Sequence, residues 1–117
     1  MTLLSLVKED YINIQDALNR LGGNTALYKT LLERFVSENL ITKIDEALNS
    51  GDMREVSHAA HTVKGVAANL SLTKLRDISA QLEQGVAGGS DISATLDEFR
   101  VIYDATNQVI SETISGL

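Results

Sequence analysis

The sequence predicts an all-α protein, an antiparallel up-and-down four-helix bundle with a short additional N-terminal helix. Apolar residues recur at spacings of three and four in every segment, and no stretch alternates with period two for long enough to form a strand. The 117 residues include no proline, so only glycines and polar caps interrupt the helices. Connections of about two to six residues favour antiparallel neighbours. The segments are divided by Gly22-Gly23, Gly51, Gly85 and Gly88-Gly89.

The first two helices follow from their caps and apolar positions. An apolar cluster opens the chain, at Leu3, Leu4, Leu6 and Val7. Asn13 can then cap a short helix that ends at Gly22, a good C′ residue. The second helix begins at Asn24 or Thr25 and ends at Ser50-Gly51. Its roughly 25 residues are enough for a bend or break near residues 37–39. The stripe that we expect to be buried is Leu27, Leu31, Phe35, Leu40, Ile41, Ile44 and Leu48.

Three further helices complete the predicted bundle. Asp52 begins the third, with Glu55 three residues later as in a capping box. The fourth contains Leu75, Ile78, Leu82 and Val86. Ser90 or Asp91 opens the last, which contains Ile92, Leu96, Phe99, Tyr103, Thr106, Ile110 and Ile114.

Composition restricts the class of protein. A chain of this length is the size of one domain, so we expect a single helical domain over residues 1–117. The absence of cysteine excludes disulfide scaffolds, thiol catalysis and cysteine-ligated metals. The net charge of −6 argues against nucleic-acid partners and against a polybasic membrane anchor. With no apolar run of membrane-spanning length and no signal-peptide pattern at the start, we expect a soluble, monomeric, cytoplasmic protein.

The third helix has the most unusual surface. On a helical wheel its apolar residues fall within a sector of about 80°, which must face the core. They are Val56, Ala60, Val63, Ala67 and Leu70. His61 points roughly 140° away from that sector, to solvent or to a rim. Lys64 and Gly65 lie next to it, three and four residues later.

These neighbours predict a phosphate-carrying site. A glycine inside a helix costs about 1 kcal/mol relative to alanine, so Gly65 needs a reason, and close approach of another protein supplies one. Imidazole titrates near neutrality and is nucleophilic, and the ammonium of Lys64 can pair with an anion. Each element also has an ordinary explanation: an exposed histidine, a solvated lysine, or a glycine at a helix contact. His58 and His61 could also bind a metal, but Glu55 is the sole carboxylate near them in the helix.

The segment from Ala60 to Leu70 resembles the histidine-containing phosphotransfer (HPt) domain of bacterial phosphorelays. It has an Ala-His pair, two residues, Lys64-Gly65 and a small-residue stretch that ends in Asn69-Leu70. The resemblance extends over nearly the whole chain, through residues 20–24, 28–35 and 82–83. After the Asn-Leu pair the family usually has a glycine, where this chain has Ser71; we expect Ser71 to cap the next helix, with a shifted turn and intact function.

The resemblance implies a specific function. His61 would be phosphorylated, Lys64 would neutralise phosphoryl oxygens, and Gly65 would allow a receiver domain to dock. Such domains have no ATP site and no kinase activity, so the chain would be a phosphocarrier between response-regulator receiver domains, with a hybrid sensor histidine kinase as a further partner. It would need no cofactor of its own, because the receiver supplies the magnesium ion. The chain could be free-standing or the C-terminal module of a membrane-attached sensor kinase.

Docking should centre on the outward face of the third helix. Besides Lys64 and Gly65, the expected docking residues on that helix are Ser57, His58 and Ala68, and the second helix near Phe35 to Asn39 is expected to contribute. His58 could tune the electrostatic potential around His61, but we favour the interpretation that it is simply exposed to solvent. The alternative function is a helical domain that binds a receiver or another partner without accepting phosphate, and a metal-binding bundle is the third hypothesis.

Overall fold

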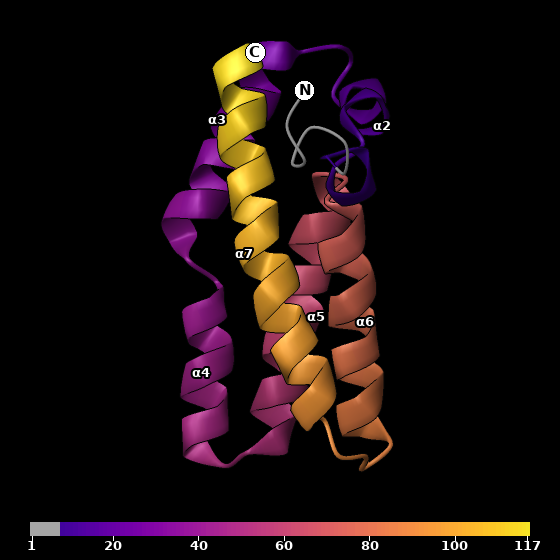
Figure 1. The fold of residues 1–117 in the computed structure, drawn as a ribbon, viewed down its shortest axis with the longest axis vertical. Helices are drawn as coiled ribbons and strands as arrows, with labels where there is room; N and C mark the ends of the chain where they lie inside the picture. The colour runs from indigo at the N-terminus through magenta and orange to yellow at the C-terminus, as the bar shows by residue number, and fades with distance from the viewer. Residues whose placement is uncertain (1–7) are drawn as a thin grey trace.

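The computed structural model describes residues 8–117, so the apolar cluster at Leu3, Leu4, Leu6 and Val7 lies outside the described residues. From residue 14 onward the chain forms six helices. They are α2 (Ile14–Arg20), α3 (Thr25–Glu38), α4 (Ile41–Ser50), α5 (Met53–Asn69), α6 (Thr73–Ala87) and α7 (Ser93–Gly116). Figure 1 shows α3 and α4 following one another downwards, after which α5 rises, α6 descends and α7 rises. The predicted all-α class is confirmed.

The predicted second helix is broken, so the helix count differs from the expected four plus one. Asn39 separates α3 from α4 with a φ of +50°, in the left-handed region. Asparagine adopts this conformation more readily than most residues, because its short side chain can bond locally. Leu40 follows and is buried, which fixes the direction in which α4 leaves the break. The break therefore falls at the end of the segment in which the sequence predicted it.

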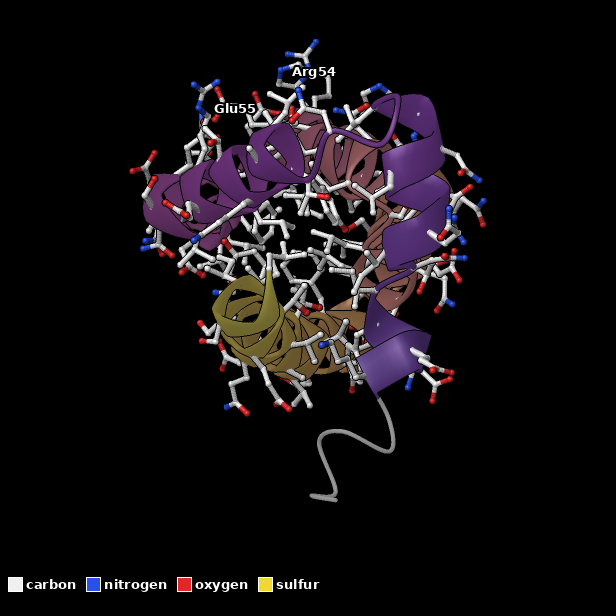
Figure 2. The ribbon with its side chains drawn as sticks, turned by 90° about the horizontal axis from the view of Figure 1, so that it is seen from above. Arg54 and Glu55 are labelled. Carbon is white, nitrogen blue, oxygen red and sulfur yellow. The ribbon has the colours of Figure 1, made fainter. Side chains whose placement is uncertain are left out.

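A single apolar core lies between the helices. Figure 2 shows carbon-rich side chains filling the space between the helices and charged ends pointing outward. The rings of Phe35 and Phe99 lie 5.8 and 6.0 Å from that of Tyr103, measured between centroids, so aromatic contacts join α3 to α7. Among residues 8–117, no helix is long and apolar enough to cross a membrane.

The expected buried stripe of α3 is wrong in part. Leu27, expected in the core, is 41% exposed, and Leu31 is half-buried. The buried face of this helix is instead formed by Tyr28, Leu32 and Phe35. Tyr28 takes the core position because its ring is buried while its hydroxyl donates a hydrogen bond to the Leu70 carbonyl, at 2.8 Å. A tyrosine whose hydroxyl finds a partner can therefore displace a leucine from the core face.

Helix starts follow the predicted caps in most cases. The side chains of Asn13, Asn24 and Asp52 accept hydrogen bonds from backbone N–H groups of the first turns that follow them. The capping box at Glu55 is wrong, since the backbone N–H of Asp52 donates to the hydroxyl of Ser50. The last helix begins at Ser93, two or three residues after the predicted start at Ser90 or Asp91, because the Asp91 carboxylate accepts from both the backbone N–H and the hydroxyl of Ser93.

The turn after α5 keeps the geometry that a glycine would give. Ser71 has a φ of +56°, and the Leu72 N–H donates to the Ala67 carbonyl while the Ser71 N–H donates to the Ala68 carbonyl. These two bonds make a Schellman motif, with Ser71 at its left-handed position. The expectations that Ser71 caps the next helix and that the turn shifts are therefore wrong. The N-cap of α6 is Leu72, without a side-chain bond.

Contacts from α2 hold Ser71 in this conformation. Its hydroxyl donates to the Asp16 carboxylate at 2.7 Å and accepts from the guanidinium of Arg20. Arg20 also donates to the carbonyls of Ala68 and Asn69, each at 2.9 Å, and so adds a second partner for Ala68 and supplies one for Asn69 at the end of the helix. The hydrogen bond from Ser71, followed by that from Arg20, lowers the pKa of Asp16. We call Asp16, Arg20 and Ser71 the α2–α5 latch.

Candidate functional site

The two faces of α5 differ as the sequence predicts. The apolar stripe from Val56 to Leu70 is buried, and every residue expected in it is at most 3% exposed. The side chain of His61 lies on the opposite side and is 63% exposed. The helix therefore anchors its inner face in the core and presents an accessible imidazole on its outer face.

Glu83 of α6 contacts both candidate phosphate-handling residues. One carboxylate oxygen lies 2.7 Å from Nδ1 of His61, and the other accepts a hydrogen bond from Nζ of Lys64 at 2.6 Å. The side chain of Glu83 is 24% exposed and that of Lys64 is 31% exposed. Helices α5 and α6 lie side by side along their length, which places a residue near the end of α6 next to the middle of α5 (Figure 1).

The charge on Glu83 determines which nitrogen of His61 is free. The hydrogen bond from Lys64 lowers the pKa of Glu83, burial opposes this effect, and the contact with His61 lowers the pKa further. An ionised carboxylate can only accept hydrogen bonds, so Nδ1 of His61 must carry the proton in this contact. In the neutral imidazole the lone pair then lies on Nε2, on the side of the ring away from Glu83. The arrangement therefore leaves a nucleophilic nitrogen facing solvent.

Lys64 is close to the imidazole but already paired. Its ammonium shares one carboxylate with His61, so these three residues form a connected group. The pair is partly exposed, and a flexible lysine can leave its carboxylate partner when an anion of higher charge arrives. An anion arriving at His61 would therefore meet an ammonium within reach.

Gly65 leaves an open area on the helix beside His61. A Cβ atom at this position would have no neighbouring atom within 4 Å, so no contact inside the molecule requires a glycine. Ala68, one turn later, is also exposed, and Ser57 is half-buried. The helix surface next to the imidazole therefore has only small side chains at Ser57, Gly65 and Ala68, which favours close approach of another protein.

His58 lies apart from this group. It is exposed on the flank of α5 that faces α4, where it lines a shallow depression with Lys43, Glu46 and Thr62. Within residues 8–117, no three His, Cys, Asp or Glu side chains are grouped so that they could hold a metal ion. The described geometry gives His58 and His61 no third ligand and engages Nδ1 of His61 with Glu83.

A comparison with sequence models of known protein families shows which family the chain belongs to. The sequence model of the Hpt domain matches residues 30–112. The chain belongs to the Hpt domain family. Hpt domains carry out histidine phosphotransfer in phosphorelays of two-component signalling, where they interact with receiver domains. Neither the curated proteins nor the solved structures gave a match.

Two parts of this Hpt site differ from what sequence reasoning expected. The resemblance includes Glu83 only as a residue similar to those of related domains, and the sequence does not predict its contact with His61. Its one sequence signal is the position after Leu82, a core residue, which places Glu83 on a flank of α6. Phe35, expected near the docking surface, is 1% exposed and cannot contribute to it, whereas its neighbours Arg34 and Glu38 are exposed beside Val66 of α5.

Proposed function

We propose that this Hpt domain is a phosphorelay intermediate that accepts a phosphoryl group on His61 from a receiver-domain aspartyl phosphate and passes it to another receiver domain. The contact between Nδ1 of His61 and Glu83 is the observation that supports this most strongly. It orients the ring, fixes the proton on Nδ1 and leaves Nε2 free at the surface. A histidine exposed without function would not need a carboxylate partner on the next helix.

The proposed transfer is a displacement at phosphorus. The lone pair of His61 Nε2 forms the new N–P bond while the bond between phosphorus and the aspartyl oxygen breaks, so the aspartate leaves as a carboxylate. The imidazole gains positive charge in this step, and the carboxylate of Glu83 stabilises that charge through the proton on Nδ1. Transfer to the second receiver is the reverse reaction with a different aspartate.

The surrounding residues would assist without forming bonds to phosphorus. Lys64 would move from Glu83 towards the phosphoryl oxygens, whose charge exceeds that of one carboxylate. Gly65 and Ala68, with Ser57 and His58 at the edges, would form the surface on which the receiver docks. The receiver would bring the magnesium ion, and the Hpt domain would contribute neither a cofactor nor kinase activity.

The proposed arrangement of the domain follows from the same role. We propose that residues 1–117 act as one domain in which α3 and α4 together provide one side of an up-and-down four-helix bundle. It would work as a monomer in the cytoplasm, with receiver domains of response regulators or of a hybrid sensor histidine kinase as partners.

A labelling experiment tests the proposal. A receiver domain carrying a ³²P-labelled aspartyl phosphate is mixed with the wild-type chain, with His61→Gln and with His58→Gln. We expect acid-labile, alkali-stable label on the wild type and on His58→Gln, and no label on His61→Gln. Circular dichroism should give the same helical signal for all three, because both side chains are exposed.

Two outcomes would contradict the proposal. Label on the His61→Gln chain would place the phosphoryl group elsewhere. Unlabelled wild type that still binds a receiver, with an affinity unchanged by His61→Gln, would favour the alternative function of a binding domain without phosphotransfer.

A further inference from the structure

A second cation lies on the outward face of α5, two turns before His61. Arg54 and His61 are seven residues apart, so they share one side of the helix at a separation of about 10 Å along its axis. The side chain of Arg54 is 95% exposed, and its guanidinium lies 3.8 Å from the Asp52 carboxylate, too far for a hydrogen bond. Figure 2 shows Arg54 projecting from the edge of the bundle that lies away from the yellow α7.

The charge pattern of this face differs from that of the whole chain. The net charge of the protein is −6, whereas the outward side of α5 has two cations, Arg54 and Lys64, and one exposed carboxylate, Glu55, which projects beside Arg54 in Figure 2. The other outward positions of α5 include Ser57, His58, His61, Gly65 and Ala68, which have no acidic side chain. An acidic partner is therefore repelled less along this side of α5 than the net charge of the whole chain would imply.

Two of the cations near the face are engaged within the molecule. Lys64 pairs with Glu83 at 2.6 Å. Arg20, at the far end of α5, is held by the α2–α5 latch and by two backbone carbonyls. Arg54 has no contact of that quality among the described residues, which leaves its guanidinium available to another protein.

The size of a protein–protein contact places Arg54 inside the docking area. A standard interface buries about 800 Å² on each partner, equivalent to a disc of roughly 16 Å radius. Centred on His61, such a disc includes Arg54, about 10 Å away. The partner must bring an aspartyl phosphate to His61, so the part of it that faces α5 is anionic.

We propose that Arg54 pairs with a carboxylate of the receiver domain, close to the phosphorylated aspartate, and thereby helps to select which receiver docks. This inference rests on the proposed function of His61. Arg54 is a docking residue at the rim of the contact and touches none of the reacting atoms. Rim charges act mainly on the association rate and on its salt dependence. Arg54 should therefore change kcat/KM and leave the rate of transfer at saturating receiver unaltered.

The test compares the removal of one positive charge at each of two arginines. Transfer of label from a phosphorylated receiver is measured for the wild type, Arg54→Gln, Arg54→Lys and Arg100→Gln. Arg100 lies on α7, across the bundle from Arg54, and pairs with Asp45 of α4. Both glutamine variants change the net charge by the same amount, so a difference between them reports position and not overall charge.

We expect Arg54→Gln to lower kcat/KM about threefold to tenfold at low salt, with the loss shrinking as ionic strength rises. Arg54→Lys should retain most of the wild-type value, and Arg100→Gln should match the wild type. Equal values for Arg54→Gln and Arg100→Gln, with normal labelling of His61, would overturn this inference and leave the proposed function intact. A wild-type chain that takes no label from any receiver would overturn both.

Discussion

The middle of α5 around His61 and the last turn of the same helix before Ser71 lie about 10 Å apart along the helix axis, yet they are built in opposite ways. At the last turn, the α2–α5 latch and Tyr28 occupy the carbonyls from Ala68 to Leu70. On the outer face around His61, the Glu83 carboxylate connects the imidazole to α6, and a bare glycine follows. The first region is closed by contacts within the molecule and the second is open.

This difference separates stability from function along one helix. The latch holds a non-glycine residue in a left-handed conformation, which costs roughly 1–2 kcal/mol and is compensated by the contacts of its hydroxyl. Gly65 has the opposite effect, because an ordinary residue there would make the helix more stable without any clash. Substitutions in the two regions should therefore affect different measurements.

The largest expected effect is the loss of phosphotransfer in the Gly65→Leu variant. The added side chain meets nothing in the domain itself, so the free energy of unfolding should rise by about 0.5–1 kcal/mol. The same side chain would hold a receiver away from His61, and misplacement of about 1 Å can cost 100-fold in rate. We expect at least a 10-fold loss of transfer, measured by label on His61 together with urea unfolding. Unchanged transfer would show that Gly65 is not covered by the receiver.

A smaller loss is expected from Glu83→Gln. The amide can still accept the hydrogen bond from His61 but has no charge to stabilise the phosphorylated ring. We expect the rate at saturating receiver to fall about 10-fold, with KM little changed, since the group acts on the developing charge. Glu98→Gln on α7 is the control, because Glu98 is exposed and lies beside Lys74 and Asp77 of α6 and not beside His61. Equal rates for the two variants would contradict the role given to Glu83.

The lowered pKa of Glu83 predicts how the difference in stability between the wild type and Glu83→Gln depends on pH. Because the contacts with Lys64 and His61 lower this pKa below the ordinary value of 4.5, the folded state gains stability from the ionised form. That gain is present above pH 4.5 and is lost as the pH falls through the lowered pKa. The difference in unfolding free energy between the wild type and Glu83→Gln should shrink only in that acidic range. A difference that grows on acidification would contradict the assignment.

The smallest effects on phosphotransfer are expected from substitutions of Ser71, of which two can be compared. Ser71→Ala loses the hydroxyl contacts and keeps the left-handed strain, whereas Ser71→Gly loses the contacts and removes the strain. We expect the alanine variant to be less stable than the glycine variant by about 1 kcal/mol in urea unfolding. Both should transfer phosphate at the wild-type rate. A glycine variant less stable than the alanine variant would contradict the Schellman geometry.

The sequence predicted best what depends on one helix alone. The core stripe of α5 and the exposure of His61 follow from the helical repeat, and the capping residues Asn13, Asn24 and Asp52 follow from side-chain chemistry. Glu83 was missed because spacing within a chain defines neighbours along a helix and not the rotation of the next helix. Leu27 was misplaced for a related reason, since a hydrogen bond to Leu70 on another helix decided that Tyr28 faces the core.

The turn at Ser71 required tertiary information as well. A serine after a helix predicts a cap for the next one when only local chemistry is considered. Here Asp16 and Arg20, about fifty residues earlier in the chain, bind the hydroxyl and stabilise the left-handed conformation instead. No local pattern contains that contact.

The central claim is that Glu83 holds Nδ1 of His61 and leaves Nε2 to carry the phosphoryl group. Nitrogen–phosphorus coupling in the NMR spectrum of the ¹⁵N-labelled, phosphorylated chain tests this directly, because it identifies the bonded ring nitrogen. We expect coupling to Nε2 of His61, with Nδ1 still protonated. Coupling to Nδ1 of His61, or to either nitrogen of His58, would contradict the account.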